Sequence, residues 1–93
     1  MSKKRFASVW DAIEDTAEEA ENMKLRSALM ITLKERIAAA GISQSQAAEL
    51  FGVTQPRISD LIRGKISLFG LDALVNMAAA AGLRIEMRVR EAA

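Results

Sequence analysis

Ser43–Lys65 has the sequence SQSQAAELFGVTQPRISDLIRGK, which predicts two short helices separated by a tight turn. Ser43 and Gln46 have the spacing of a capping box, in which each side chain accepts a hydrogen bond from the backbone N–H of the other residue. Gly52 suits the left-handed conformation in which many helices end. We therefore expect one helix over about residues 44–51 and a second helix that begins shortly after the glycine.

The second helix, over about residues 55–63, is expected to have one apolar and one polar face. Thr54 can cap this helix, and Pro56 falls in its first turn, where a missing N–H costs nothing. The apolar residues share one face at helical spacing and should point into a core. They are Ile58, Leu61 and Ile62. The face left to solvent is rich in hydrogen-bonding groups and consists of Gln55, Arg57, Ser59, Asp60 and Arg63.

Flanking segments predict further helices around this pair. A capping box that starts at Thr16 opens a long helix over residues 16–40. Its buried stripe is expected to repeat every four residues, at Leu25, Leu29, Leu33 and Ile37. A last helix spans residues 71–81, and residues 8–15 form either a short helical turn or an irregular lead-in. The expected fold is a single all-α domain of about five helices over residues 1–93.

The residues after Gly82 change from a helical to an alternating pattern. Every second residue is apolar, and the apolar set is Leu83, Ile85, Met87 and Val89. This alternation predicts a half-buried β-strand over residues 83–90. One strand cannot satisfy its own backbone groups, so it needs a partner. The candidates are residues 6–10, another protein, or the same strand of a second subunit in a symmetric dimer, which we favour.

Length and composition limit the function classes of this chain. With 93 residues, 51% of them hydrophobic and 27% charged, it is expected to form one small globular domain. The absence of Cys and His excludes disulfides and removes the commonest metal ligands and acid–base group. We therefore expect no enzyme activity, no metal and no cofactor. Because no run of residues approaches the length of a membrane span, we expect a cytoplasmic protein with no membrane partner.

Charge is distributed unevenly along the chain, although the formal net charge is only +1. Residues 11–21 are acidic and contain no base, which is the ordinary composition of a solvated helix surface. By contrast, Arg57, Arg63 and Lys65 surround the polar face of the second short helix. Together with Gln55 they favour a nucleic-acid partner, because a protein-binding surface would present exposed apolar anchors there.

Several positions in the two short helices resemble the helix-turn-helix of the Cro and lambda-repressor class, also called the Xre family. The matching positions are Gln44, Ala48, Gly52-Val53-Thr54, Ile58-Ser59 and Gly64-Lys65. The run from Val53 to Leu61, followed by Arg63-Gly64-Lys65, is similar to the HigA-type antitoxin branch. The resemblance implies a lambda-repressor-like bundle that binds double-stranded DNA at a palindromic operator as a homodimer. It also implies an antitoxin that neutralises a RelE-like ribonuclease toxin and represses its own operon.

The expected DNA-binding residues lie in and around the two short helices and are Gln44, Thr54, Gln55, Arg57, Ser59, Asp60, Arg63 and Lys65. Gln55 can pair with adenine, and Arg57 can pair with guanine or hold a phosphate. Asp60 can accept from cytosine, or it can orient Arg57 or Arg63 on the helix surface. Lys65 and Arg63 would hold the DNA backbone, and Gln44 resembles the phosphate-binding glutamine of the family.

Two other functions are compatible with the sequence. One is a stand-alone Xre-type regulator that has no toxin partner. The other is a protein-interaction module that uses the same helical scaffold but does not bind DNA. A neighbouring toxin gene would distinguish an antitoxin from a stand-alone regulator, and sequence-specific DNA binding would distinguish either of them from the interaction module.

Overall fold

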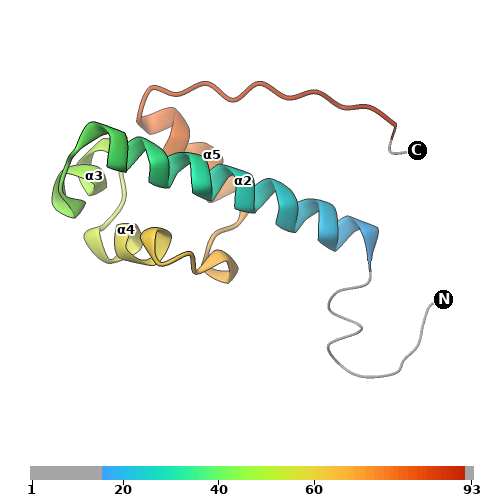
Figure 1. Cartoon of the computed structure of the whole chain (residues 1–93), viewed down its shortest axis with the longest axis horizontal. Helices are drawn as coiled ribbons and strands as arrows, with labels where there is room; N and C mark the ends of the chain where they lie inside the picture. The colour runs from blue at the N-terminus through green and yellow to red at the C-terminus, as the bar shows by residue number, and fades with distance from the viewer. Residues whose placement is uncertain (1–15, 92–93) are drawn as a thin grey trace.

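The computed structural model describes residues 16–91, which form a bundle of four α-helices and one short 3-10 helix (Figure 1). In chain order the elements are α2 (Ala17–Ala40), α3 (Gln44–Phe51), α4 (Gln55–Ile62), η1 (Ile66–Leu68) and α5 (Leu71–Ala80). The expected long helix, pair of short helices and last helix are therefore confirmed. Residues 8–15, for which either a short helical turn or an irregular lead-in is expected, lie outside the described residues. The described part of the chain supports four α-helices, not the expected five.

Side-chain caps begin three of these helices where the sequence predicts them. The Thr16 hydroxyl accepts a hydrogen bond from the Glu19 backbone N–H at 3.0 Å and starts α2. Ser43 and Gln46 form the complete capping box of α3, with reciprocal bonds of 3.1 and 2.9 Å. Thr54 caps α4 by accepting from Arg57 N–H at 3.3 Å. Each cap satisfies a backbone donor that the helix itself leaves unpaired.

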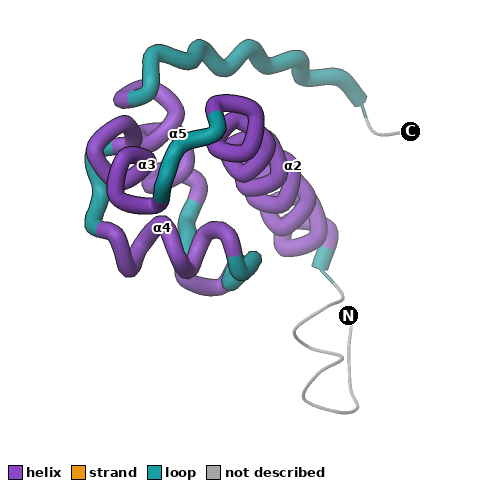
Figure 2. Tube along the Cα trace, turned by 60° about the vertical axis from the view of Figure 1, so that its left-hand side comes forward, coloured by secondary structure: helices purple, strands orange, loops and turns teal. Residues whose placement is uncertain are grey.

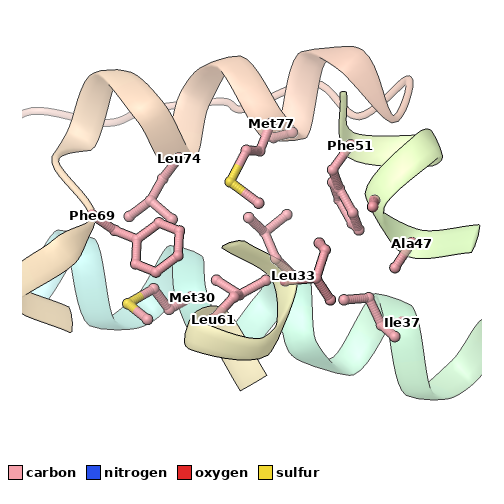
Figure 3. Packing of buried hydrophobic residues seen from close by; sticks show 12 residues of the cluster. Met30, Leu33, Ile37, Ala47, Phe51, Leu61, Phe69, Leu74 and Met77 are labelled. Carbon is pink, nitrogen blue, oxygen red and sulfur yellow. The ribbon is translucent and has the colours of Figure 1, made fainter. Parts of the chain in front are cut away.

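One hydrophobic core joins the four α-helices. Its buried members are Met30, Leu33, Ile37, Ala47, Ala48, Phe51, Ile58, Leu61, Phe69, Leu74, Met77 and Ala78. Helix α2 packs against α5 and α4, and α3 packs against α4 and α5. Figure 3 shows the Phe69 ring between Leu74 of α5 and Met30 of α2. Because a fully buried large apolar side chain contributes about 1.5–3 kcal/mol, this shared core stabilises helices that are too short to form alone.

The buried stripe of α2 differs from the expected one at its N-terminal end. Leu33 and Ile37 are buried and Leu29 is half-buried, as predicted, but Leu25 is 40% exposed. Met30, at 3% exposure, belongs to the core instead. The reason is that the N-terminal third of α2 extends past the other helices of the described part of the chain (Figure 1). Helical spacing gives the apolar face, but it does not give the length over which neighbouring helices cover that face.

The predicted C-terminal strand is not formed in the described chain. Residues 83–91 are extended, yet no β-strand occurs among the described residues, because no second segment pairs with this one. Leu83 is half-buried against the core and its N–H donates to Ala78 O at 2.9 Å, whereas Met87 and Val89 are 75% and 86% exposed. In both Figure 1 and Figure 2 this C-terminal segment lies on the opposite side of the bundle from α4.

Gly52 is expected to be the most sensitive position of the turn between α3 and α4. Its φ of 70° is left-handed, although a Cβ added there would meet only Ala80 Cβ at an ordinary 3.7 Å. The cost of Gly52→Ala is therefore backbone strain, and we expect a loss of about 1–2 kcal/mol in the free energy of unfolding. Urea denaturation measures this loss. Gly70→Ala is the matched control because Gly70 has φ −79° and open space around it. Equal losses for the two variants would contradict the assignment.

Candidate nucleic-acid interface

The candidate interface is built on the junction of α3 and α4. Ala47 and Ala48 are buried and small, so α3 can pack closely on α4. In the turn between the helices, the Val53 N–H donates to Ala48 O at 3.0 Å. The Val53 side chain packs against the core as the apolar residue of the turn. These contacts fix the direction in which α4 leaves α3.

Helix α4 has the two faces that the sequence predicts. Ile58 and Leu61 are both 0% exposed, and Ile62 packs against the core as a half-buried side chain. Gln55 and Arg63 are exposed on the opposite side. The remaining polar residues of this face are half-buried, and they are Arg57, Ser59 and Asp60. The structure therefore brings five of the expected site residues together on α4 and at its C-terminal end.

Arg57 makes a contact that sequence reasoning missed. Its guanidinium carbon lies 4.4 Å from the centroid of the Phe69 ring. Phe69 is fully buried and follows η1, so the guanidinium covers the outer face of a core side chain. A stacked guanidinium keeps its N–H groups available at its edge for planar, bidentate hydrogen bonding. No spacing rule links the two residues, because the contact depends on how the loop after α4 folds back.

Asp60 pairs with a different residue from the two that were expected. The sequence offers Arg57 and Arg63 at helical spacing, but the structure places Lys65 Nζ at 3.6 Å from Asp60 Oδ1. The Lys65 N–H also donates to Asp60 O at 3.1 Å, which holds the turn after α4 against the helix end. Because the lysine side chain is 47% exposed, this ion pair contributes little to stability. Lys65 can therefore exchange its carboxylate partner for another anion at low cost.

The other two expected residues lie at helix starts. Gln44 is the exposed first residue of α3, and Thr54 is the exposed N-cap of α4. The Thr54 hydroxyl is already used as the cap acceptor. Gln44 takes part in none of the side-chain hydrogen bonds found within residues 16–91. Both residues are accessible, but they lie at the edge of the group of polar residues on α4.

Arg26 of α2 is a second contact that the sequence did not indicate. Its Nη1 donates to Ile66 O at 3.3 Å and to Phe69 O at 3.4 Å. These two carbonyls belong to the loop that follows α4, forty residues or more along the chain. Arg26 therefore attaches the long helix to the segment that carries Phe69. The sequence showed Arg26 only as one of several cations, because a side-chain bond to a distant backbone has no local signature.

Residues 16–91 contain neither a cluster of potential metal ligands nor a helix able to span a membrane. No group of three or more potential ligands from Asp, Glu, Cys or His gathers in residues 16–91. Among the helices of that part, none combines the length and apolar character needed to cross a bilayer.

Comparison with known proteins agrees with this geometry. A family model described as "Helix-turn-helix domain" matches residues 12–90. A solved structure titled "Putative XRE Family Transcriptional Regulator" is similar with a TM-score of 0.72 and 29% sequence identity, over 78% of this chain and 82% of that one. No curated protein matches the sequence. The match to that structure supports the Xre resemblance, while none of these matches concerns the HigA-type branch.

The contact between Arg57 and Phe69 predicts that Arg57→Ala lowers stability in the absence of any ligand. The substitution removes a cation–π contact and uncovers a buried ring, so we expect a loss of about 1 kcal/mol in the free energy of unfolding. Arg63→Ala is the matched control, because Arg63 is exposed and should change stability by less than about 0.5 kcal/mol. Urea denaturation of both variants is the measurement. A loss of the same size in both would mean that the stacking contributes nothing.

Proposed function

We propose that this chain, which belongs to the helix-turn-helix domain family, is a sequence-specific DNA-binding transcriptional regulator. The observation that carries the proposal is the composition of the outer face of α4. Burial of Ile58 and Leu61 leaves Gln55, Arg57 and Arg63 outward, and these residue types are the ones that pair with base edges and phosphates. An exposed helix of this kind fits the major groove of DNA.

Two side chains on α4 are proposed to read bases. Gln55 is the exposed first residue of α4, where its amide can make paired hydrogen bonds with adenine. Arg57 can pair with guanine O6 and N7 through the free edge of its stacked guanidinium. Asp60 is proposed to position Lys65 through their ion pair. The alternative role of Asp60 is to accept a hydrogen bond from cytosine through its second carboxylate oxygen.

The remaining residues of the interface are proposed to contact the DNA backbone. They are Gln44, Thr54, Ser59, Arg63 and Lys65. Lysine and arginine contacts of this type supply affinity that is independent of sequence and falls with increasing salt. The exposed end of Lys65 suits this use because its weak ion pair can be replaced by a phosphate.

The protein is proposed to act as a homodimer on a palindromic operator. One helix as short as α4 contacts few base pairs, so helix-turn-helix proteins commonly place two such helices about one DNA turn apart. The C-terminal segment supports this proposal, because Met87 and Val89 are exposed apolar residues on an extended backbone that pairs with no other segment of residues 16–91. A second copy of the segment would satisfy those backbone groups. Because the segment lies opposite α4 (Figure 2), this pairing leaves α4 uncovered.

An antiparallel register centred on Met87 suits the pattern of residues in the C-terminal segment. Met87 then faces the partner's Met87, and Ile85 faces the partner's Val89, which puts apolar side chains on one side. On the other side Glu86 faces the partner's Arg88, whereas Arg84 faces the partner's Arg90, a like-charge pair nearer the ends of the ladder. A register centred on Glu86 would instead oppose two carboxylates, which is unfavourable. Centring on Met87 also pairs the whole of residues 83–91, so it uses the longest possible ladder.

The role of antitoxin is proposed from the HigA-type resemblance of the run Val53–Lys65. In this role the protein would neutralise a RelE-like ribonuclease toxin and repress its own operon. The segment that carries Leu83, Ile85, Met87 and Val89 could pair with a toxin strand instead of a second copy of the chain. The alternative regulator without a toxin predicts the same DNA binding. Co-expression with the product of a neighbouring gene, followed by co-purification, distinguishes the two.

The test of DNA recognition is selection of bound duplexes from a random pool, followed by titration of the selected duplex at two salt concentrations. Recovery of one palindromic site, with strong preference over random DNA, is expected. The spacing of its half-sites should be about one DNA turn or a multiple of it. Weak binding without sequence preference would contradict the proposal and favour the protein-interaction module.

Variants of the two cations should separate base readout from backbone contact. Arg57→Ala is expected to reduce discrimination at one base pair of each half-site by about 1–3 kcal/mol, because a bidentate pair is lost. Lys65→Ala is expected to weaken binding to all sequences nearly equally and to reduce the salt slope by about one per subunit. Salt-dependent titrations with the selected duplex and single-base variants of it measure both effects. If both variants bind like the parent protein, α4 is not the recognition helix.

A single-cysteine scan tests the proposed dimer and its register. The chain contains no Cys, so every disulfide formed would report an introduced residue. Facing Cα atoms of an antiparallel pair lie about 4.5–5.5 Å apart, within disulfide range. Met87→Cys is therefore expected to form a covalent dimer on mild oxidation. Ile85→Cys is the control, because its two copies would be separated by about four residue steps of 3.4 Å. A monomer in sedimentation, or equal cross-linking at both positions, would overturn the register.

A further inference from the structure

We propose that Arg26 is a positioning residue for DNA readout, although it lies on α2, outside the two helices of the proposed DNA-binding face. Through two backbone carbonyls it holds the loop that places the Phe69 ring beneath Arg57. This inference rests on the proposed function, and it adds a residue that the helix-turn-helix segment itself does not contain.

The first step of the argument is the attachment of α2 to the loop between α4 and α5. Arg26 Nη1 donates to Ile66 O at 3.3 Å and to Phe69 O at 3.4 Å. Ile66 is the first residue of η1, and Phe69 directly follows η1. These are the only side-chain hydrogen bonds to this loop within the described residues. Both bonds are partly buried. The guanidinium therefore fixes both ends of the short helical turn to α2.

The second step is the position of Phe69. Its side chain is 0% exposed and lies near Met30, Leu61 and Leu74 in the core (Figure 3). A ring held on its inner side by three helices can present its outer face in only one orientation. Arg57 covers that face, with its guanidinium carbon 4.4 Å from the ring centroid. The position of the ring therefore sets the position of the guanidinium.

The third step is the consequence of stacking for readout. A long arginine side chain loses considerable rotamer freedom when it is held in one geometry. Stacking against Phe69 imposes much of that loss before DNA is present, which favours contact with a base at a fixed position. If the loop shifts away from α2, the ring and the guanidinium shift with it. Arg26 thus acts on specificity through Phe69 and Arg57, with no contact to DNA of its own.

Arg26→Lys is the variant that tests this proposal, because it keeps the charge and removes the planar fork of donors. The measurement compares its affinity for the selected duplex with its affinity for a duplex altered at one base pair. That base pair is the one at which Arg57→Ala loses discrimination. We expect this discrimination to fall by about threefold to tenfold, the size of a lost cation–π contact. Binding to random DNA should not change. Arg36→Lys is the matched control, because Arg36 is exposed on the same helix, and it should behave like the parent protein.

The double variant of Arg26 and Arg57 provides the decisive comparison. In the background of Arg57→Ala, Arg26→Lys is expected to have no further effect on discrimination, because the two residues act as a unit. The proposal is overturned if Arg26→Lys weakens binding to all duplexes equally, or if its effect persists in that background. The first result would mean that Arg26 serves stability alone, and the second would mean that it affects readout by a route that does not pass through Arg57.

Phe69→Leu is a second variant that keeps a buried apolar side chain but removes the aromatic face. It should lower discrimination at the same base pair as Arg26→Lys, and thermal denaturation without DNA checks that each variant is folded at the assay temperature. Unchanged discrimination in a folded Phe69→Leu protein would overturn the role of the ring. If the proposed function itself is wrong, the parent protein shows no sequence preference at all. This outcome is distinct from a failure of the role proposed for Arg26.

Discussion

Burial of Ile58 and Leu61 sets the orientation of α4, and with it the place of every polar residue on that helix. Both side chains are 0% exposed, on a helix that packs against α2 and α3. An eight-residue helix does not form stably in water without such packing. The polar face of α4 is therefore a consequence of its apolar face. The caps at Ser43 and Thr54 set the residues at which α3 and α4 begin. They thereby help to determine which side chains of these helices point inward.

The parts of the fold that sequence reasoning predicted are those determined within a few residues. The capping box at Ser43, the left-handed Gly52 and the inward face of α4 depend on spacings of two to four residues, and all three are confirmed. The parts it missed depend on contacts across the chain. Arg26 bonds to carbonyls at Ile66 and Phe69, and no periodicity marks such a bond. Asp60 pairs with Lys65 because Gly64 turns the chain back, whereas helical spacing pointed to the two arginines.

In the C-terminal segment, the alternating sequence pattern correctly predicts an extended backbone but wrongly predicts a β-strand. Alternation of apolar and charged residues describes which side chains can be buried together, and residues 83–91 are extended as that pattern requires. A strand also needs hydrogen bonds from a neighbour, and the described residues of one chain supply none. Leu83, next to α5, is half-buried, while exposure rises to 75% at Met87 and 86% at Val89. This gradient is consistent with a segment whose far end is completed by another chain.

A chain with a net charge of only +1 can still recognise DNA if its cations differ in how they are held. Lys65 is paired with Asp60 at the surface, so exchange of the carboxylate for a phosphate costs little. Lys65 therefore suits a backbone contact, which every DNA sequence offers. Arg57 is held over a buried ring, so it suits a contact at one position only. Affinity and specificity are then assigned to different side chains by their surroundings. Such a division does not require a large positive charge, because the proposed specificity rests on the geometry around Arg57 and not on the number of cations.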